Sequence, residues 1–172
     1  MTKHQLIRGI YTFIFFTLCI GYILFVLNPQ GVSAASTFQF DFLFCFAASW
    51  ILRKPYLVPT LLLVAIWFLQ DILYGLPLGL WAAIAVAALE FLRQMFGVIR
   101  YRSFLAEWSL FCATYLAANL FHYFIFLLIL SSRPPLNEIL VLVGFTILVY
   151  PFTVIATNLV FRMYKVTLSP SQ

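Results

Sequence analysis

Asp41 and Asp71 are acidic side chains that interrupt long apolar runs of the chain. A carboxyl group in apolar surroundings is costly, so it either lines a functional site or is satisfied by local hydrogen bonds. One hypothesis is that both acids line an outward-facing cleft. The other is structural: Asp41 caps the helix that follows it, and Asp71 accepts hydrogen bonds from the loop amides of residues 75–79.

Two rows of polar residues follow helical spacing further along the chain. They are Tyr115, Asn119 and His122 in one row, and Thr146, Tyr150, Thr153 and Thr157 in the other. A proton relay or a polar substrate path would use such rows, with His122 as the titrating group. Interhelical hydrogen bonding, at about 0.6 kcal/mol per pair, is the alternative that we favour, because a relay usually needs an acid at mid-depth and these rows contain none.

No other catalytic or metal-binding pattern is present. The chain lacks the phosphate-binding glycine loop, the zinc-binding HExxH motif and the GxSxG nucleophile motif. Its three cysteines, Cys19, Cys45 and Cys112, have no metal-ligand spacing, and we interpret them as small buried apolar side chains. The sequence therefore predicts no catalytic residue, no metal and no cofactor.

The composition indicates which elements position these side chains. Hydrophobic residues make up 65% of the 172 residues and charged residues 9%, whereas soluble domains contain about 45–50% and about 25%. The basic residues are isolated or paired and form no stripe for nucleic acid. We therefore expect an all-α integral membrane protein, with one polytopic domain over residues 1–172 and an uncleaved first span.

Six membrane spans are predicted, because a spanning helix needs about 20 apolar residues. The expected spans are residues 9–27, 38–52, 56–74, 80–92, 105–130 and 139–161. The second and fourth are short for a bilayer. Residues 75–79 contain two glycines and a proline, so this connector is too broken to be helical.

The basic residues predict the orientation of these spans. Nine of the ten Lys and Arg residues fall on one side, and only Arg133 falls on the other. The positive-inside rule makes the richer side cytoplasmic, which places both termini inside. Asp41 and Asp71 then lie at one depth near the outer surface, on helices expected to be antiparallel neighbours and within reach of Arg133.

Two ion pairs and one helix contact are also predicted. Glu90 should pair with Arg93, and Glu107 with Arg100 or Arg102, near the cytoplasmic surface. Close helix approach, within the protein or with a partner, is predicted for the alanines of the fourth span. These are Ala82, Ala83, Ala85, Ala87 and Ala88.

Residues 50–79 resemble the rod shape-determining protein MreD family. The shared features are Trp50 before Arg53, Lys54, Pro55 and Tyr56, then Pro59, then Gln70 and Asp71, and finally Gly75, Pro77, Leu78 and Gly79. A looser likeness in length, span number and cytoplasmic termini extends over nearly the whole chain. The resemblance implies a non-enzymatic component of the bacterial cell-elongation complex in the cytoplasmic (inner) membrane.

The resemblance also implies partners. MreD proteins associate with MreC, a single-span protein, and through it with the MreB filament and peptidoglycan synthases. The sequence leaves open which helices contact the partner and whether the protein forms a homodimer.

A second function remains open because the substrate-binding subunits of energy-coupling-factor transporters look like distant relatives with a similar six-helix fold. On that hypothesis the chain binds a vitamin-like small molecule in an outward cavity lined by Asp41, Asp71, Asn119 and His122. Those subunits carry alanines on their first helix, whereas residues 9–27 contain none.

Overall fold

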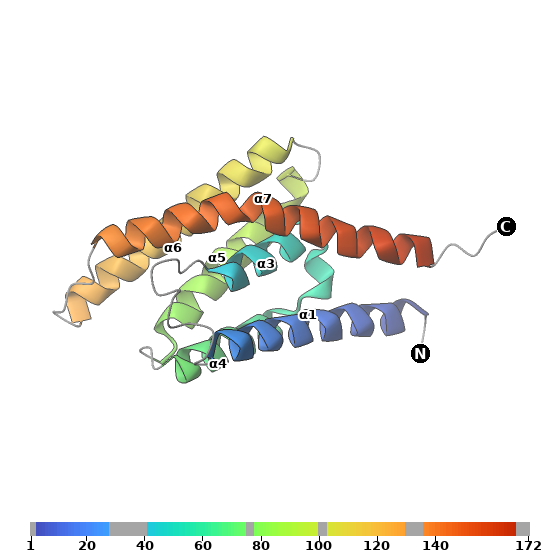
Figure 1. Cartoon of the computed structure of the whole chain (residues 1–172), viewed down its shortest axis with the longest axis horizontal. Coiled ribbons are helices and arrows are strands. Elements are labelled where there is room, and N and C mark those ends of the chain that lie inside the picture. The colour runs from blue at the N-terminus through green and yellow to red at the C-terminus, as the bar shows by residue number, and fades with distance from the viewer. Residues whose placement is uncertain (1–2, 28–40, 75–77, 100–102, 130–135, 168–172) are drawn as a thin grey trace.

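The described part of the chain is built from helices and contains no strand. The computed structural model describes residues 3–27, 41–74, 78–99, 103–129 and 136–167. Its elements are α1 (Lys3–Leu27), α3 (Phe42–Ile51), the 3-10 helix η1 (Pro55–Leu57), α4 (Thr60–Leu73), α5 (Leu80–Ile99), α6 (Phe104–Ile129) and α7 (Leu136–Thr167) (Figure 1). The predicted all-α class is confirmed.

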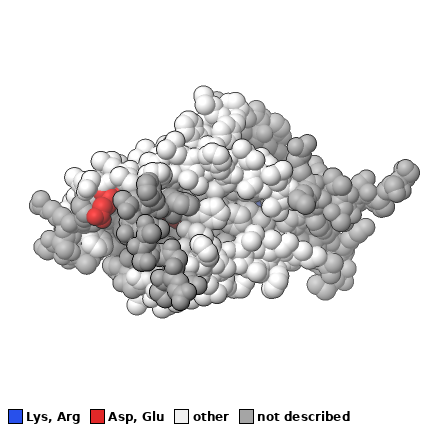
Figure 2. Space-filling model, viewed as in Figure 1, with Lys and Arg blue, Asp and Glu red and all other residues white. Residues whose placement is uncertain are grey.

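Four helices, α1, α5, α6 and α7, are long and apolar enough to cross a membrane. The outer surface carries large apolar side chains, and six of them are at least 69% exposed: Phe13, Phe25, Leu61, Leu128, Leu140 and Phe152. Among the described residues, the face in Figure 2 is nearly free of charge, with acidic atoms toward its left end. A surface of this kind suits lipid contact.

The other two α-helices are too short to cross the hydrocarbon core alone. At 1.5 Å per residue, the ten residues of α3 and the fourteen of α4 extend about 15 and 21 Å, against a core of about 30 Å. Eight of the ten α3 residues are buried, and α3 packs chiefly against α7 and α5. A short helix at membrane depth is tolerated where protein covers it, as here.

The fourth predicted span is shorter than the helix that the structure shows at its position. The fourth predicted span ends at Leu92, but α5 continues to Ile99. Arg93 does not interrupt the helix, because its Nη2 donates to the carbonyl of Val58 at 2.6 Å and its Nε lies 3.3 Å from Glu90 Oε2. The boundary error arose from treating a charged residue as the end of a helix.

Two helices also begin later than predicted. Asp41 is the N-cap of α3, and not a residue one turn inside it. Pro59 precedes α4 as its N-cap, because proline restricts the chain before it to extended conformations. By contrast, α7 is longer at both ends than the predicted 139–161.

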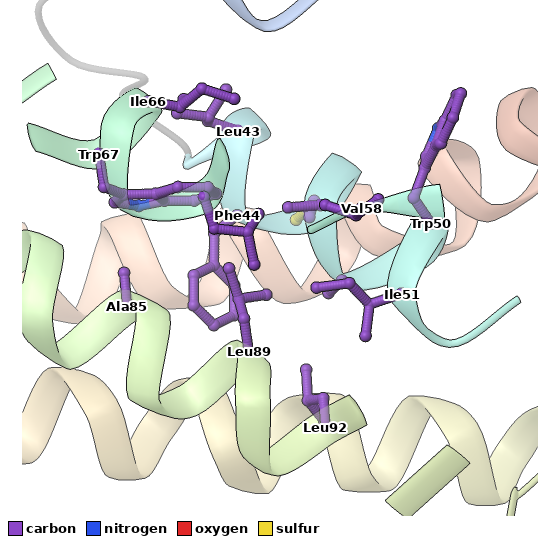
Figure 3. Close-up of a cluster of buried hydrophobic side chains, with 14 of the residues drawn as sticks. Leu43, Phe44, Trp50, Ile51, Val58, Ile66, Trp67, Ala85, Leu89 and Leu92 are labelled. Carbon is purple, nitrogen blue, oxygen red and sulfur yellow. The ribbon is translucent and has the colours of Figure 1, made fainter. Parts of the chain in front are cut away.

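The core lies where α3, α4 and α5 meet. Phe44 of α3 and Trp67 of α4 are fully buried, and Leu89 and Ala85 of α5 complete the contact (Figure 3). Trp50 belongs to the same buried cluster, and its ring contacts Phe15, Phe46 and Phe161 within 5.5 Å between centroids. The helices therefore pack through aromatic side chains of α3.

Figure 1 shows that α1 begins and α7 ends at the same end of the molecule. The α3 to η1 turn lies toward that end as well, whereas the end of α4 lies toward the other. Each end of the bundle therefore gathers segments that are distant in the sequence.

Gly79 gives a test of how α5 begins. Its φ of +80° is unfavourable for residues with a Cβ, while an added Cβ would meet only Phe68 Cε2 at 3.9 Å. We expect Gly79→Ala to lower the free energy of unfolding by about 1–2 kcal/mol through backbone strain alone. Gly97→Ala is the control, since Gly97 is helical with nothing within 4 Å. Denaturation in mixed micelles measures the free energy of unfolding of both variants. Equal effects would contradict the assignment of backbone strain to position 79.

Candidate functional site

Asp71 caps a helix other than its own. It lies in the last turn of α4 with no exposed surface, and its Oδ2 accepts hydrogen bonds from the backbone amides of Gly79 at 3.0 Å and Ala82 at 3.2 Å. The first amides of a helix have no partner within it, so an acceptor from α4 satisfies the start of α5. Asp71 Oδ2 therefore accepts a hydrogen bond from one of the expected loop amides, that of Gly79. Gly75 and Pro77 lie outside the described residues.

The second oxygen of the Asp71 carboxyl group accepts no hydrogen bond from the described residues. Asp71 Oδ1 is buried without a hydrogen-bond partner among the described residues, as is the neighbouring Gln70 Oε1. His122 packs its ring on Trp81, two residues beyond Gly79, at 5.2 Å between centroids. The predicted contact of Asp71 with Arg133 remains a prediction, because Arg133 lies outside the described residues.

Asp41 has the equivalent role at the start of α3. Its Oδ1 accepts a hydrogen bond from the amide of Phe44 at 3.0 Å. Its own backbone amide donates to Thr146 Oγ1 at 3.0 Å, which ties α3 to α7. The predicted pairing of α3 with α4 is not the main packing of either helix, since α3 packs chiefly on α7 and α4 on α5.

The polar row of α6 does not form a continuous relay. Asn119 Nδ2 donates to the carbonyl of Tyr115 on its own helix at 2.9 Å, and Tyr115 Oη donates to Thr146 Oγ1 at 3.4 Å. The half-buried His122 packs between the rings of Trp81 and Phe126. Tyr115 and His122 therefore contact neighbouring helices, α7 and α5, whereas the Asn119 bond lies within α6 and is not the interhelical bond that the structural hypothesis expects.

The polar row of α7 is bonded mostly to its own backbone. Thr153 Oγ1 donates to the carbonyl of Tyr150 and Thr157 Oγ1 to that of Thr153, both at 2.7 Å. Threonine hydroxyl groups make such bonds inside helices. Thr157 also bonds Ser49 Oγ at 2.8 Å, which links α7 to α3.

A charged junction between three helices was not predicted from the sequence. Arg53 Nη1 lies 3.1 Å from Glu107 Oε1, and the two side chains are only 14% and 15% exposed. The same oxygen accepts from Tyr150 Oη at 2.7 Å, and Arg53 Nε donates to Asn158 Oδ1 at 2.7 Å. The junction thereby connects the turn after α3 with α6 and α7.

Within the described residues the partner of Glu107 is Arg53. The predicted partners Arg100 and Arg102 lie outside the described residues, so that pairing stays a prediction. Sequence spacing could not find the Arg53–Glu107 pair, because 54 residues separate its members. The predicted pair of Glu90 and Arg93 is confirmed. Of the remaining motif residues, Pro55 begins η1, and Lys54 Nζ lies 5.6 Å from the centre of the Tyr56 ring.

An apolar groove of about 700 Å³ runs between α5 and α6. Exposed alanines form both of its walls: Ala83 and Ala87 on α5, Ala113 and Ala117 on α6. Ala82 and Ala85 face the interior instead, where both are buried. The predicted run of small residues is therefore divided between the core and an open surface.

None of the four residues expected to line a ligand cavity borders this groove. Those residues are Asp41, Asp71, Asn119 and His122. Within the described residues no group of three His, Cys, Asp or Glu side chains is placed to hold a metal. Cys19 and Cys45 are buried and Cys112 is partly buried, and all three are free thiols.

Comparison with known proteins gives no match: no protein-family model, no curated protein and no solved structure matches the chain.

Two substitutions of Asp71 test whether this residue acts as a helix cap or as an acidic group that lines a cleft. Asp71→Ala removes the acceptor for two backbone amides, and we expect it to lower the free energy of unfolding by about 1–3 kcal/mol. Asp71→Asn keeps an acceptor oxygen and should retain most of that stability. Thermal unfolding in nanodiscs measures both variants. If Asn and Ala are equally destabilising, the carboxylate charge matters more than the cap.

Proposed function

We propose that the chain is a non-enzymatic, multi-pass component of the bacterial cell-elongation complex in the cytoplasmic (inner) membrane. In this role it binds an MreC-like single-span protein, and through it an MreB-like filament and peptidoglycan synthases. The main support is that Asp41, Asp71 and Asn119, three of the four residues expected to bind a ligand, bond to backbone groups of the bundle. What remains for function is an apolar exterior, and such a surface acts through contact with other membrane helices.

The residues of the MreD-like stretch support this proposal through their positions. Asp71 and Gly79 fix the start of α5 against α4. Arg53 joins α3 to α6 and α7. A family motif that shapes both ends of a helix bundle suits a protein whose surface is its working part.

A six-span topology with both termini in the cytoplasm is part of the proposal. It is supported by the distribution of basic residues and by the location of the start of α1 and the end of α7 at one end of the molecule (Figure 1). In this topology α3 and α4 reach the membrane surfaces only together with their flanking segments.

The transporter-subunit alternative is less well supported by these contacts. It needs Asp41, Asp71, Asn119 and His122 to face a common ligand. Asp41 and Asp71 bond to backbone amides, and Asn119 bonds to the backbone of its own helix. The absence of alanine from residues 9–27 also counts against it.

Depletion of the protein in the rod-shaped bacterium that encodes it tests the proposed function. We expect cells to become round, and a single-span protein with a large periplasmic domain to co-purify with the tagged chain. Unchanged rods would contradict the proposal. Co-purification of an ATPase with a second membrane subunit would favour the transporter alternative.

The alanine groove gives a more local test, with the helix of the single-span partner as its occupant. The groove extends over about 17 Å of α5, from Leu80 to Phe91. Its shape is therefore that of an elongated helix contact, in which small residues permit close approach.

We expect Ala87→Trp, which fills the groove, to reduce co-purification of the partner at least tenfold. Ala65→Trp is the matched control, because Ala65 is an exposed alanine of α4 that does not line the groove. Quantitative pull-down from detergent-solubilised membranes measures both. Equal recovery of the partner with both variants would exclude the groove as the contact.

A further inference from the structure

Pro151 interrupts the backbone hydrogen bonding of α7. A proline has no amide hydrogen, so the carbonyl four residues earlier, that of Ile147, loses its partner within the helix. The indole Nε1 of Trp108 on α6 donates to this carbonyl at 3.2 Å. A side chain of another helix thus replaces the missing bond.

The same segment of α6 holds the turn of α7 just before the proline. Glu107 accepts a hydrogen bond from Tyr150 Oη at 2.7 Å. Phe111 stacks on the Tyr150 ring, with 3.8 Å between centroids and 14° between planes. Three neighbouring side chains of α6, at positions 107, 108 and 111, therefore contact α7 on the N-terminal side of Pro151.

After Pro151, α7 is held by α3 and by the turn that follows α3. Thr157 bonds Ser49, and Asn158 Oδ1 accepts from Arg53 Nε at 2.7 Å. Arg53 is also the ion-pair partner of Glu107. The Arg53–Glu107 pair consequently links the α6 contacts before Pro151 to the Arg53 contact after it, alongside α3, which bonds Thr146 before the proline and Thr157 after it.

We propose that α7 is a two-part helix hinged at Pro151, and that the Arg53–Glu107 pair and the Trp108 indole form a latch that fixes the angle between its parts. With the latch closed, α6 and α3 set one orientation for the segment after Pro151. With the latch broken, that segment moves about the proline, and the end of α7 changes its position relative to α4. The hinge stands on these contacts and does not depend on the partner proposed above.

The size of the motion follows from helix geometry. Proline is one of the few features at which helices kink by more than 20°. Leu159 is eight residues beyond the hinge, about 12 Å along the helix, so a change of about 20° would move it by about 4 Å. A displacement of that size can be measured between spin labels.

Double electron–electron resonance on the full chain in nanodiscs tests the latch, with labels at Leu61 of α4 and Leu159 of α7. Both positions are exposed, and neither belongs to the latch. Chains without the introduced cysteines show the background from Cys19, Cys45 and Cys112. The test variant combines Glu107→Gln and Trp108→Phe, which remove the ion pair and the indole donor.

We expect the label distance to shift or broaden by about 4 Å in this double variant. Adding Pro151→Ala should reverse the change, because an alanine at this position supplies the backbone amide that the carbonyl of Ile147 lacks. Glu138→Gln is the matched control, since Glu138 is an exposed acid in the first turn of α7, and it should leave the distance unchanged.

An unchanged distribution in the double variant would overturn the proposal, and so would a change that Pro151→Ala does not reverse. Should the double variant fail to fold, Pro151→Ala alone decides. A hinged α7 predicts a narrower distribution in that variant than in the natural chain. An equal width would contradict the hinge.

Discussion

The constraint on which this structure depends is that a polar group in hydrocarbon must find its hydrogen-bond partner within the protein. One oxygen of Asp71 meets it by capping α5, Asp41 meets it by capping α3, and Trp108 meets it by replacing the amide that Pro151 lacks. Arg53 and Glu107 meet it together. Apart from the local cap at Asp41, each solution joins two elements that are separate along the chain, so these polar groups help to determine how the apolar helices are arranged.

This use of polar groups bears on function. The acids that would be expected to bind a ligand are bonded to helix ends, while exposed alanines and large apolar side chains form the surface. Transmembrane helices associate through close packing of small residues. The groove between α5 and α6 is the proposed surface for contact, and Pro151 in α7 is the proposed point of movement.

Sequence reasoning was most accurate where the signal was a long apolar run. The predicted span 105–130 is within one residue of α6 at each end, because no proline or charge interrupts it beyond its first turn. Local capping at Asp41 was also recognisable, since an N-cap needs only neighbouring residues. The partner of Glu107 was not, because it depends on how α3 and α6 pack across 54 residues. Surface grooves likewise arise from two helices together, so the alanines predicted a contact but not which side of α5 would be open.

Site-specific photo-crosslinking in native membranes tests most directly whether this bundle works by contact. A photoreactive residue at Ala113, in the groove, is compared with one at Val64, an exposed position of α4 outside it. If the protein binds a partner helix there, position 113 yields one crosslinked single-span protein and position 64 does not. Crosslinks from both positions to lipid alone would contradict a contact function for the groove.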